Sequence, residues 1–190
     1  MIGEEKNVGS IVAGYEVLGT EDTLINILRD DPSYKVFIAI GDNWTRYQVM
    51  QRLLENFPPI EISSAIHPCA LIGKDEVIGK GVAVMAGVVI NSHSIVEDFC
   101  ILNTQSSIDH DCILRKFSAI SPNTILGGNV IVGDFSFIAI SAILLHGITV
   151  GKHVVIGAGS LLLNNCEDNT IMYGMPAKFI RNRQAGEKYL

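Results

Sequence analysis

The sequence has little charge and few aromatic residues. Charged residues make up 18% of the 190 positions and aromatic residues 7%, with 14 Lys and Arg against 20 Asp and Glu. The formal net charge of −6 argues against a nucleic acid as the main partner, because binding a phosphate backbone requires clustered basic residues. Apolar residues make up 48% of the chain, which excludes a disordered tail and leaves ample material for a core.

Long apolar runs and cysteine motifs are also absent. No uninterrupted hydrophobic stretch approaches the length of a membrane span, and the N-terminus has no signal-peptide pattern. We therefore expect a cytoplasmic protein with no membrane partner. The four cysteines (Cys69, Cys100, Cys112 and Cys166) show no CxxC spacing, so neither a zinc knuckle nor a redox motif is indicated. We interpret Cys100 and Cys112 as small buried thiols in a reducing cytosol.

The dominant feature of the chain is a six-residue period from Ile66 to Leu162. The first residue of seventeen consecutive blocks is Ile, Leu or Val, without insertion or deletion, and the fifth is mostly small or β-branched. Neither an α-helix, with a period of about 3.6, nor a simple strand, with a period of about 2, explains this pattern. A triangular solenoid does, because each block supplies a strand and a corner and three blocks close one coil. The first and fifth side chains of each block then point inward.

The first sixty residues lack this period and are typical of a small α/β piece. We expect helices near residues 20–30 and 44–54, and a strand over residues 36–40. A strand followed by a Gly-polar loop and a helix can place a ligand at the end of the strand, although a plain connector has the same pattern. The run FPP at residues 57–59 ends the second helix. The predicted ranges are 1–60 for the α/β domain, 61–165 for the solenoid and 166–190 for a C-terminal cap.

Counting in eighteens separates one pair of histidines from the others. His110 and His146 both take the third place of their blocks, two coils apart on one corner, with Gly128 between them. The strand spacing places them about 10 Å apart. His110 lies between Asp109 and Asp111, and a carboxylate beside an imidazole fixes its tautomer and raises its basicity, as a general base requires. From the residues alone, a catalytic and a structural role both remain open. We interpret the remaining histidines as surface residues: His67, His93 and His153.

Several motifs together resemble one acyltransferase family. They are the hexapeptide array, the run LNTQSSIDHDC at residues 102–112, the run FSAISP at 117–122 and the closing GMPAK at 174–178. The chain resembles bacterial left-handed β-helix enzymes that acetylate nucleotide-linked amino sugars, and their sialic-acid O-acetyltransferase relatives. Crossover connections between parallel strands are generally right-handed. The expectation that this solenoid winds in the left-handed sense therefore comes from the resemblance alone. The expected fold is mostly β, a left-handed parallel β-helix of hexapeptide repeats with a small, truncated, Rossmann-like N-terminal domain.

The resemblance also implies an activity. It implies a homotrimer that uses acetyl-CoA as acyl donor, needs no metal, and acetylates a nucleotide sugar of the 4-amino-4,6-dideoxyhexose type in a groove between subunits. The residue matching His110 is the family's general base, Asp109 or Asp111 supports it, and the residue matching Asn103 lines the same pocket. The backbone N–H of Gly128 is expected to meet the thioester oxygen. The implied CoA contacts are Ala139, Ile140, Ala158 and Gly159, and the implied nucleotide-sugar contacts are Gly41, Asp42, Asn43 and Arg46.

Two departures from the family pattern bear on function. The sequence begins about where the family has a pair of acids, here Glu4 and Glu5, so a first strand, helix and second strand are expected to be missing. Ala119 stands where the family commonly has a His facing the acetyl group. Three alternatives therefore stay open. They are acetyl transfer to a hydroxyl of sialic acid or another small acceptor, a non-catalytic trimeric scaffold, and a metal enzyme like the gamma-type carbonic anhydrases, which the lack of any H-x4-H spacing disfavours.

Overall fold

The chain forms two compact units. The computed structural model describes residues 1–4, 7–56 and 60–189, so Glu5 and the predicted helix end at residues 57–59 lie outside the described residues. One unit comprises Met1–Val36 with Gln48–Ile62, and the other comprises Phe37–Tyr47 with Ser63–Leu190. The segment Phe37–Tyr47, which the sequence places in the N-terminal piece, thus groups with the solenoid.

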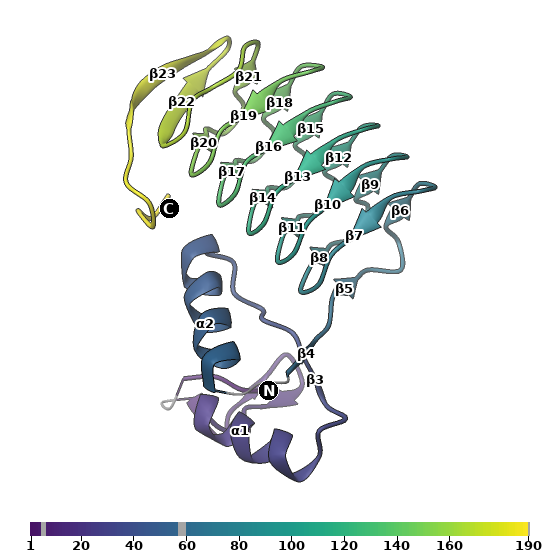
Figure 1. Cartoon of the computed structure of the whole chain (residues 1–190), viewed down its shortest axis with the longest axis vertical. Coiled ribbons are helices and arrows are strands. Elements are labelled where there is room, and N and C mark those ends of the chain that lie inside the picture. The colour runs from purple at the N-terminus through teal and green to yellow at the C-terminus, as the bar shows by residue number, and fades with distance from the viewer. Residues whose placement is uncertain (5–6, 57–59, 190) are drawn as a thin grey trace. The chain divides into compact units, whose positions relative to one another are not determined.

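Seventeen two-residue strands form the solenoid, and they stack on three faces (Figure 1). The β11 face holds β5 (Ala65–Ile66), β8 (Ala83–Val84), β11 (Ile101–Leu102), β14 (Ala119–Ile120), β17 (Phe137–Ile138) and β20 (Val155–Ile156). The β12 face holds β6 (Leu71–Ile72), β9 (Val89–Ile90), β12 (Ser107–Ile108), β15 (Ile125–Leu126), β18 (Ile143–Leu144) and β21 (Leu161–Leu162). The β13 face holds β7 (Val77–Ile78), β10 (Ile95–Val96), β13 (Ile113–Leu114), β16 (Ile131–Val132) and β19 (Thr149–Val150).

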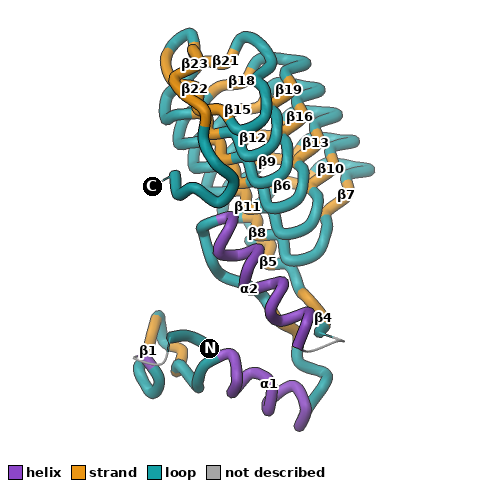
Figure 2. Tube along the Cα trace, turned by 60° about the vertical axis from the view of Figure 1, so that its left-hand side comes forward, coloured by secondary structure: helices purple, strands orange, loops and turns teal. Residues whose placement is uncertain are grey.

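Neighbouring strands on these faces pair in parallel, eighteen residues apart, as Ile101 does with Ala119 and Leu102 with Ile120. Figure 2 shows the resulting rows of short strands joined by loops. The predicted mostly β fold with a left-handed parallel β-helix is confirmed. We name the three corners after the strands that they join, as the β11–β12, β12–β13 and β13–β14 corners, each with its equivalents on the other coils.

The core follows the six-residue period as predicted. First-place side chains such as Leu102, Ile108 and Leu114 are 0% exposed, and each buried aliphatic side chain stabilises the fold by about 1.5–3 kcal/mol. The small residues at the fifth place of a block also point inward, and some of them form hydrogen bonds to the next coil. The Ser94 hydroxyl donates to the Asp109 carbonyl at 2.8 Å and accepts from the Cys112 N–H at 3.1 Å. These serine bonds satisfy polar groups that would otherwise be buried without a partner.

The C-terminal segment closes the array. Strand β22 (Thr170–Gly174) continues the β11 face by pairing in parallel with β20, and β23 (Ala177–Asn182) folds back antiparallel on it. The hairpin covers the strand edge that the last coil would otherwise leave unpaired.

The other unit contains short elements. They are a hairpin of β1 (Ile11–Val12) and β2 (Tyr15–Glu16), helix α1 (Glu21–Asp30), and β3 (Lys35–Val36) paired in parallel with β4 (Glu61–Ile62). Helix α2 (Asn43–Asn56) begins in the solenoid unit and ends in this one. The predicted strand over residues 36–40 is wrong beyond Val36, because residues 37–40 form no strand and instead line a cavity. No helix in the described ranges is long and apolar enough to cross a membrane.

Candidate functional site

His110 lies on the β12–β13 corner, directly after β12. Its Nδ1 is 2.7 Å from Asp111 Oδ2, and its side chain is 50% exposed. The Asp109 carboxylate instead accepts from Asn91 Nδ2 at 2.9 Å and from the His110 backbone N–H at 2.8 Å. Of the two acids that the sequence left open, Asp111 is therefore the ring partner. A proton held on Nδ1 by this carboxylate leaves Nε2 with the free electron pair that a general base needs.

The contact with Asp111 also sets the protonation of His110. Its hydrogen bond is the main cause that raises the pKa of His110 above the ordinary value. We expect Asp111→Asn to lower the pKa of His110, because a neutral amide no longer stabilises the imidazolium. NMR titration of the His110 ring measures this shift. Asp75→Asn is the matched control, since Asp75 has the same positive φ and the same fourth place on this corner. An unchanged His110 pKa in Asp111→Asn contradicts the assignment.

Gly128 leaves the space that the His110 ring occupies. A Cβ at Gly128 would lie 2.6 Å from both Cε1 and Nε2 of His110, closer than atoms can approach. The rings of His110 and His146, two coils apart, lean together over Gly128 with their centroids 6.2 Å apart. This is closer than the strand spacing alone suggests. The structure shows no acceptor for the Gly128 N–H among the described residues, so this donor is available beside His110 Nε2.

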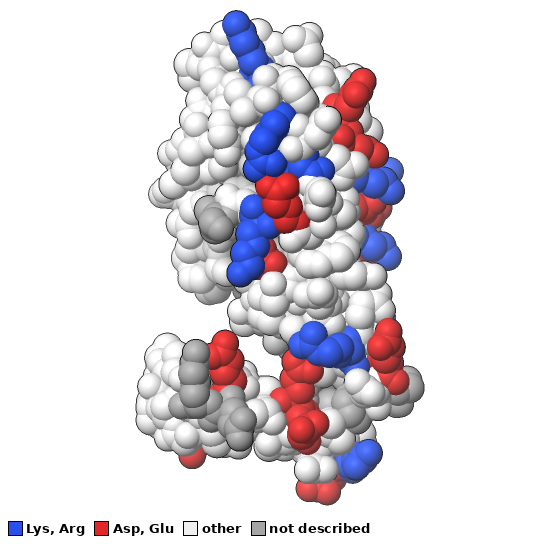
Figure 3. All heavy atoms as spheres, turned by 90° about the vertical axis from the view of Figure 1, so that its left-hand side faces the viewer, with Lys and Arg blue, Asp and Glu red and all other residues white. Residues whose placement is uncertain are grey.

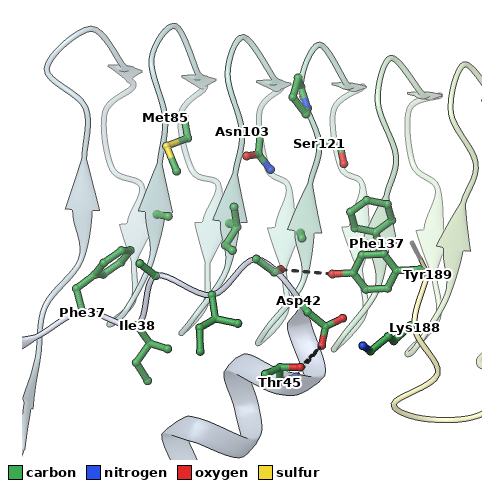
Figure 4. Close-up of a pocket in the computed structure, with 17 residues that line it drawn as sticks. Phe37, Ile38, Asp42, Thr45, Met85, Asn103, Ser121, Phe137, Lys188 and Tyr189 are labelled. Atoms are coloured by element: carbon green, nitrogen blue, oxygen red, sulfur yellow. Dashed lines mark hydrogen bonds between the residues drawn. The ribbon is translucent and has the colours of Figure 1, made fainter. Parts of the chain in front are cut away.

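A second group of predicted residues surrounds a cavity of about 600 Å³ on the β11 face (Figure 4). Asn103, Ala119, Gly41 and Asp42 line it together, so the implied nucleotide-sugar loop meets the implied pocket residue. Most of the remaining lining is apolar: Phe37, Ile38, Ala39, Ile40, Ala83, Met85, Ile101, Pro122 and Phe137. The Asn103 side chain donates to the Ile120 carbonyl on the next coil at 3.1 Å. His110 does not line this cavity.

Arg46 holds the 37–43 loop against the solenoid. Its side chain is 0% exposed. The five guanidinium N–H groups donate to the carbonyls of Phe99, Ile40, Gly41 and Phe117 and to Asn43 Oδ1, at 2.7–3.3 Å. Burial lowers the pKa of Arg46 to about 10, so it stays charged at neutral pH. Because every donor is used, Arg46 positions the loop, in place of the direct substrate contact that the sequence suggested.

Asp42 and Asn43 also form hydrogen bonds with nearby residues. Asp42 accepts from the Thr45 N–H at 2.8 Å and from the Thr45 hydroxyl at 2.7 Å, which caps helix α2. The Asn43 side chain is 2% exposed and points its amide toward the Phe135 and Ser136 carbonyls. Of the four implied nucleotide-sugar contacts, Gly41 and Asp42 are therefore the two that line the cavity.

A stack of aromatic rings on the β13–β14 corner packs against the first turns of helix α2. Phe99, Phe117, Phe135 and His153 repeat every eighteen residues and stack with centroids 4.8–5.2 Å apart and rings within 4° of parallel. Trp44 packs on this stack at Phe135 and His153, and Tyr47 packs at Phe117 and Phe135. The interpretation of His153 as a surface residue is wrong, because its ring is half-buried in this stack. His67 and His93 are exposed as expected.

Tyr189 is a cavity residue that sequence reasoning missed. Its ring stacks on Phe137 with the centroids 4.0 Å apart, and its hydroxyl accepts from the Asn43 N–H at 3.2 Å. The same hydroxyl lies 3.4 Å from the Gly41 carbonyl (Figure 4). The sequence holds no signal for this contact, since Tyr189 stands alone in a polar tail.

The residues implied for CoA lie on the β11–β12 corner, one corner away from His110. Gly159 donates its N–H to the Ile140 carbonyl at 2.9 Å, and Ala139 donates to the Ile156 carbonyl at 2.9 Å. The Ile140 side chain is 51% exposed. Within one protomer, the structure thus brings His110, Asp111 and Gly128 together but separates them from Asn103 and the implied CoA residues: Ala139, Ile140, Ala158 and Gly159.

Charged residues on the solenoid pair with one another. Glu97 with Arg115, Asp98 with Lys116 and Asp134 with Lys152 approach to 2.5–3.2 Å across neighbouring coils. On the face shown in Figure 3, acidic and basic side chains are interspersed over the described surface, without one large basic patch. Within the described ranges, no three or more His, Cys, Asp or Glu side chains are arranged to hold a metal ion.

Several known proteins resemble this chain. A family model described as the PglD N-terminal domain matches residues 2–53. The crystal structure of PerB from Caulobacter crescentus in complex with CoA and GDP-perosamine is 35% identical, with a TM-score of 0.84 over 90% of this chain and 81% of that chain. The acetyltransferase domain of PglB from Neisseria gonorrhoeae FA1090 in complex with acetyl coenzyme A is 33% identical, with a TM-score of 0.85 over 93% and 84% of the two chains. GDP-perosamine N-acetyltransferase of Escherichia coli O157:H7 is 27% identical over 155 residues, 80% of this chain and 68% of that protein.

Proposed function

Because the chain belongs to the family of hexapeptide-repeat sugar acetyltransferases, we propose that it moves the acetyl group of acetyl-CoA to the amine of a nucleotide-linked amino sugar. The observation that carries this proposal is the arrangement of His110, Asp111 and Gly128 on one corner. This arrangement supports acyl transfer, because His110 lies beside Gly128, whose backbone N–H has no acceptor among the described residues.

The geometry supports a direct transfer. As the amine nitrogen attacks the thioester carbonyl carbon, its proton passes to His110 Nε2, while Asp111 stabilises the resulting imidazolium. In this proposal the Gly128 N–H donates to the carbonyl oxygen as negative charge develops on it. When the C–S bond breaks, His110 returns the proton to the thiolate sulfur. The products are the amide and CoA.

The separation of the implied residues over two corners supports an active site between subunits. We propose a homotrimer in which the β12–β13 corner of one subunit faces the β11–β12 corner of its neighbour. The base and the oxyanion donor then come from the first subunit, and the cavity with Asn103 comes from the second. We also place the protein in the cytoplasm, where its free cysteines would remain reduced.

A thiol-release assay tests the proposed activity. The protein is incubated with acetyl-CoA and, in separate reactions, GDP-, UDP- and dTDP-linked 4-amino-4,6-dideoxyhexoses, while free CoA is followed with a thiol reagent. We expect acceptor-dependent release of CoA with at least one of these sugars. Release that does not depend on an acceptor, or no release with any of them, contradicts the proposal. Sialic acid serves as the hydroxyl acceptor for comparison.

A further inference from the structure

His146 is a second imidazole at the proposed centre. Its ring centroid lies 6.2 Å from the centroid of the His110 ring, two coils away on the same corner. This separation allows one water or one amine to lie between the two rings. His146 is exposed on its corner, so packing of the core does not require an imidazole there.

An amine acceptor that starts as ammonium must lose two protons, and a single base accounts for only one of them. An amine flanked by electron-withdrawing groups has a pKa of about 8, so at neutral pH most of the acceptor is ammonium and has no lone pair for attack. Conversion of R–NH3+ and acetyl–S–CoA into the amide and CoA–SH removes two protons from nitrogen. One of them ends on the CoA sulfur, and the other leaves the site. His110 accounts for the first of these, because it takes a proton during C–N bond formation and returns it to the thiolate.

We propose that His146 is the base that takes the other proton, from the acceptor's ammonium group, before His110 acts. This inference rests on the proposed function. The ammonium N–H donates to the neutral His146 ring, the proton moves to that ring, and the free amine then attacks the thioester beside His110 Nε2. His146 then returns its proton to water in the groove between subunits. A hydroxyl acceptor loses a single proton, so it gains little from a second base.

The surroundings of His146 suit a group that must gain and lose a proton. The adjacent coils on this corner, at residues 127–129 and 163–165, contain no ionisable side chain. The acidic groups nearby are Asp111, which binds His110, and Asp109, which is held by Asn91. On the coil before that of His110, the same corner carries one more ionisable side chain, the exposed His93. Among the described residues, no carboxylate forms an ion pair within 4.0 Å of the His146 ring, and Asp109 interacts with it only through space.

The test is the pH dependence of His146→Gln. At about pH 6.5 we expect kcat/KM for the amino sugar to fall about tenfold below the wild-type value, with the gap closing to within about twofold near pH 9, where the free amine dominates. Added imidazole should restore the variant at low pH. His67→Gln is the matched control, since His67 is exposed on a different corner. A loss of the same size at every pH, no loss, or no rescue by imidazole overturns the proposal.

A second measurement separates this inference from the proposed function. If the wild-type protein acetylates no amino sugar, the proposed function fails, and NMR titration of the two rings still decides whether they act as a pair. We expect His146→Gln to change the titration of His110, because two imidazoles whose centroids lie 6.2 Å apart titrate as a coupled pair. An unchanged His110 pKa overturns the pairing. If the wild-type protein is active but the pH profiles of the two proteins coincide, the inference fails and the proposed function stands.

Discussion

Replacing His110 with alanine is expected to lower kcat for acetyl transfer by about 10²–10⁴, the usual contribution of a positioned general base. The KM for acetyl-CoA should stay within about twofold, because the proposed role of His110 is proton transfer and not binding of CoA. Initial rates at saturating acceptor measure the effect.

His67→Ala is the control for loss of an exposed imidazole from the same solenoid. A His110→Ala protein with the wild-type kcat would remove the mechanism, while a raised KM at unchanged kcat would assign His110 to binding. Circular dichroism should show the same unfolding temperature for the variant and the wild type, since His110 is not part of the core cluster.

Replacing Arg46 with alanine should give the largest loss of stability. The change leaves four main-chain carbonyls and Asn43 Oδ1 without the donor that satisfies them, in a site that is 0% exposed. Unsatisfied buried groups of this kind and the resulting void destabilise by about 3 kcal/mol in total. For a chain of this length that corresponds to a fall of roughly 6–12 °C in the unfolding temperature.

Arg52→Ala on the same helix is the matched control. Arg52 pairs with Glu21 at 2.6 Å, with side chains 51% and 43% exposed, so its loss should shift stability by less than about 1 kcal/mol. Equal shifts for the two variants contradict the positioning role of Arg46. We also expect Arg46→Ala to raise the KM for the nucleotide sugar, because the loop that lines the cavity loses its anchor.

The solenoid could be predicted from the sequence because its register is local. The same places in every six-residue block point inward. Counting alone therefore predicts that residues eighteen apart, such as Leu102 and Ile120, lie on neighbouring coils of one face. The same counting placed His110, Gly128 and His146 on one corner. It could not choose between Asp109 and Asp111, because that choice depends on Asn91 one coil earlier, which holds the Asp109 carboxylate.

The loop around Arg46 could not be predicted in the same way. Its sequence resembles a ligand-binding loop, and the groups that bury Arg46 are carbonyls of Phe99 and Phe117, far away in the sequence. The aromatic stack of Phe99, Phe117 and Phe135 does carry a signal, since these rings share the fourth place at eighteen-residue intervals. An apolar ring at an exposed corner requires a covering element, and that reasoning could have found Trp44 and Tyr47.

The residues of the implied site are divided between two corners of the solenoid. The family motif lists Asn103 and His110 seven residues apart, yet in the solenoid they lie on adjacent corners, and the cavity that Asn103 lines does not include His110. A chain folded as a single protomer therefore presents two partial sites. Their union across a subunit boundary is what the proposed trimer supplies.

The most direct test is the structure of the reaction product. The wild-type protein is incubated with acetyl-CoA and a nucleotide-linked 4-amino-4,6-dideoxyhexose, and the product is analysed by mass spectrometry and NMR. We expect one added acetyl group per sugar, bound to the amine nitrogen as an amide, and its loss in His110→Ala. An acetyl ester on a sugar hydroxyl, or unmodified sugar with the wild-type protein, would contradict it.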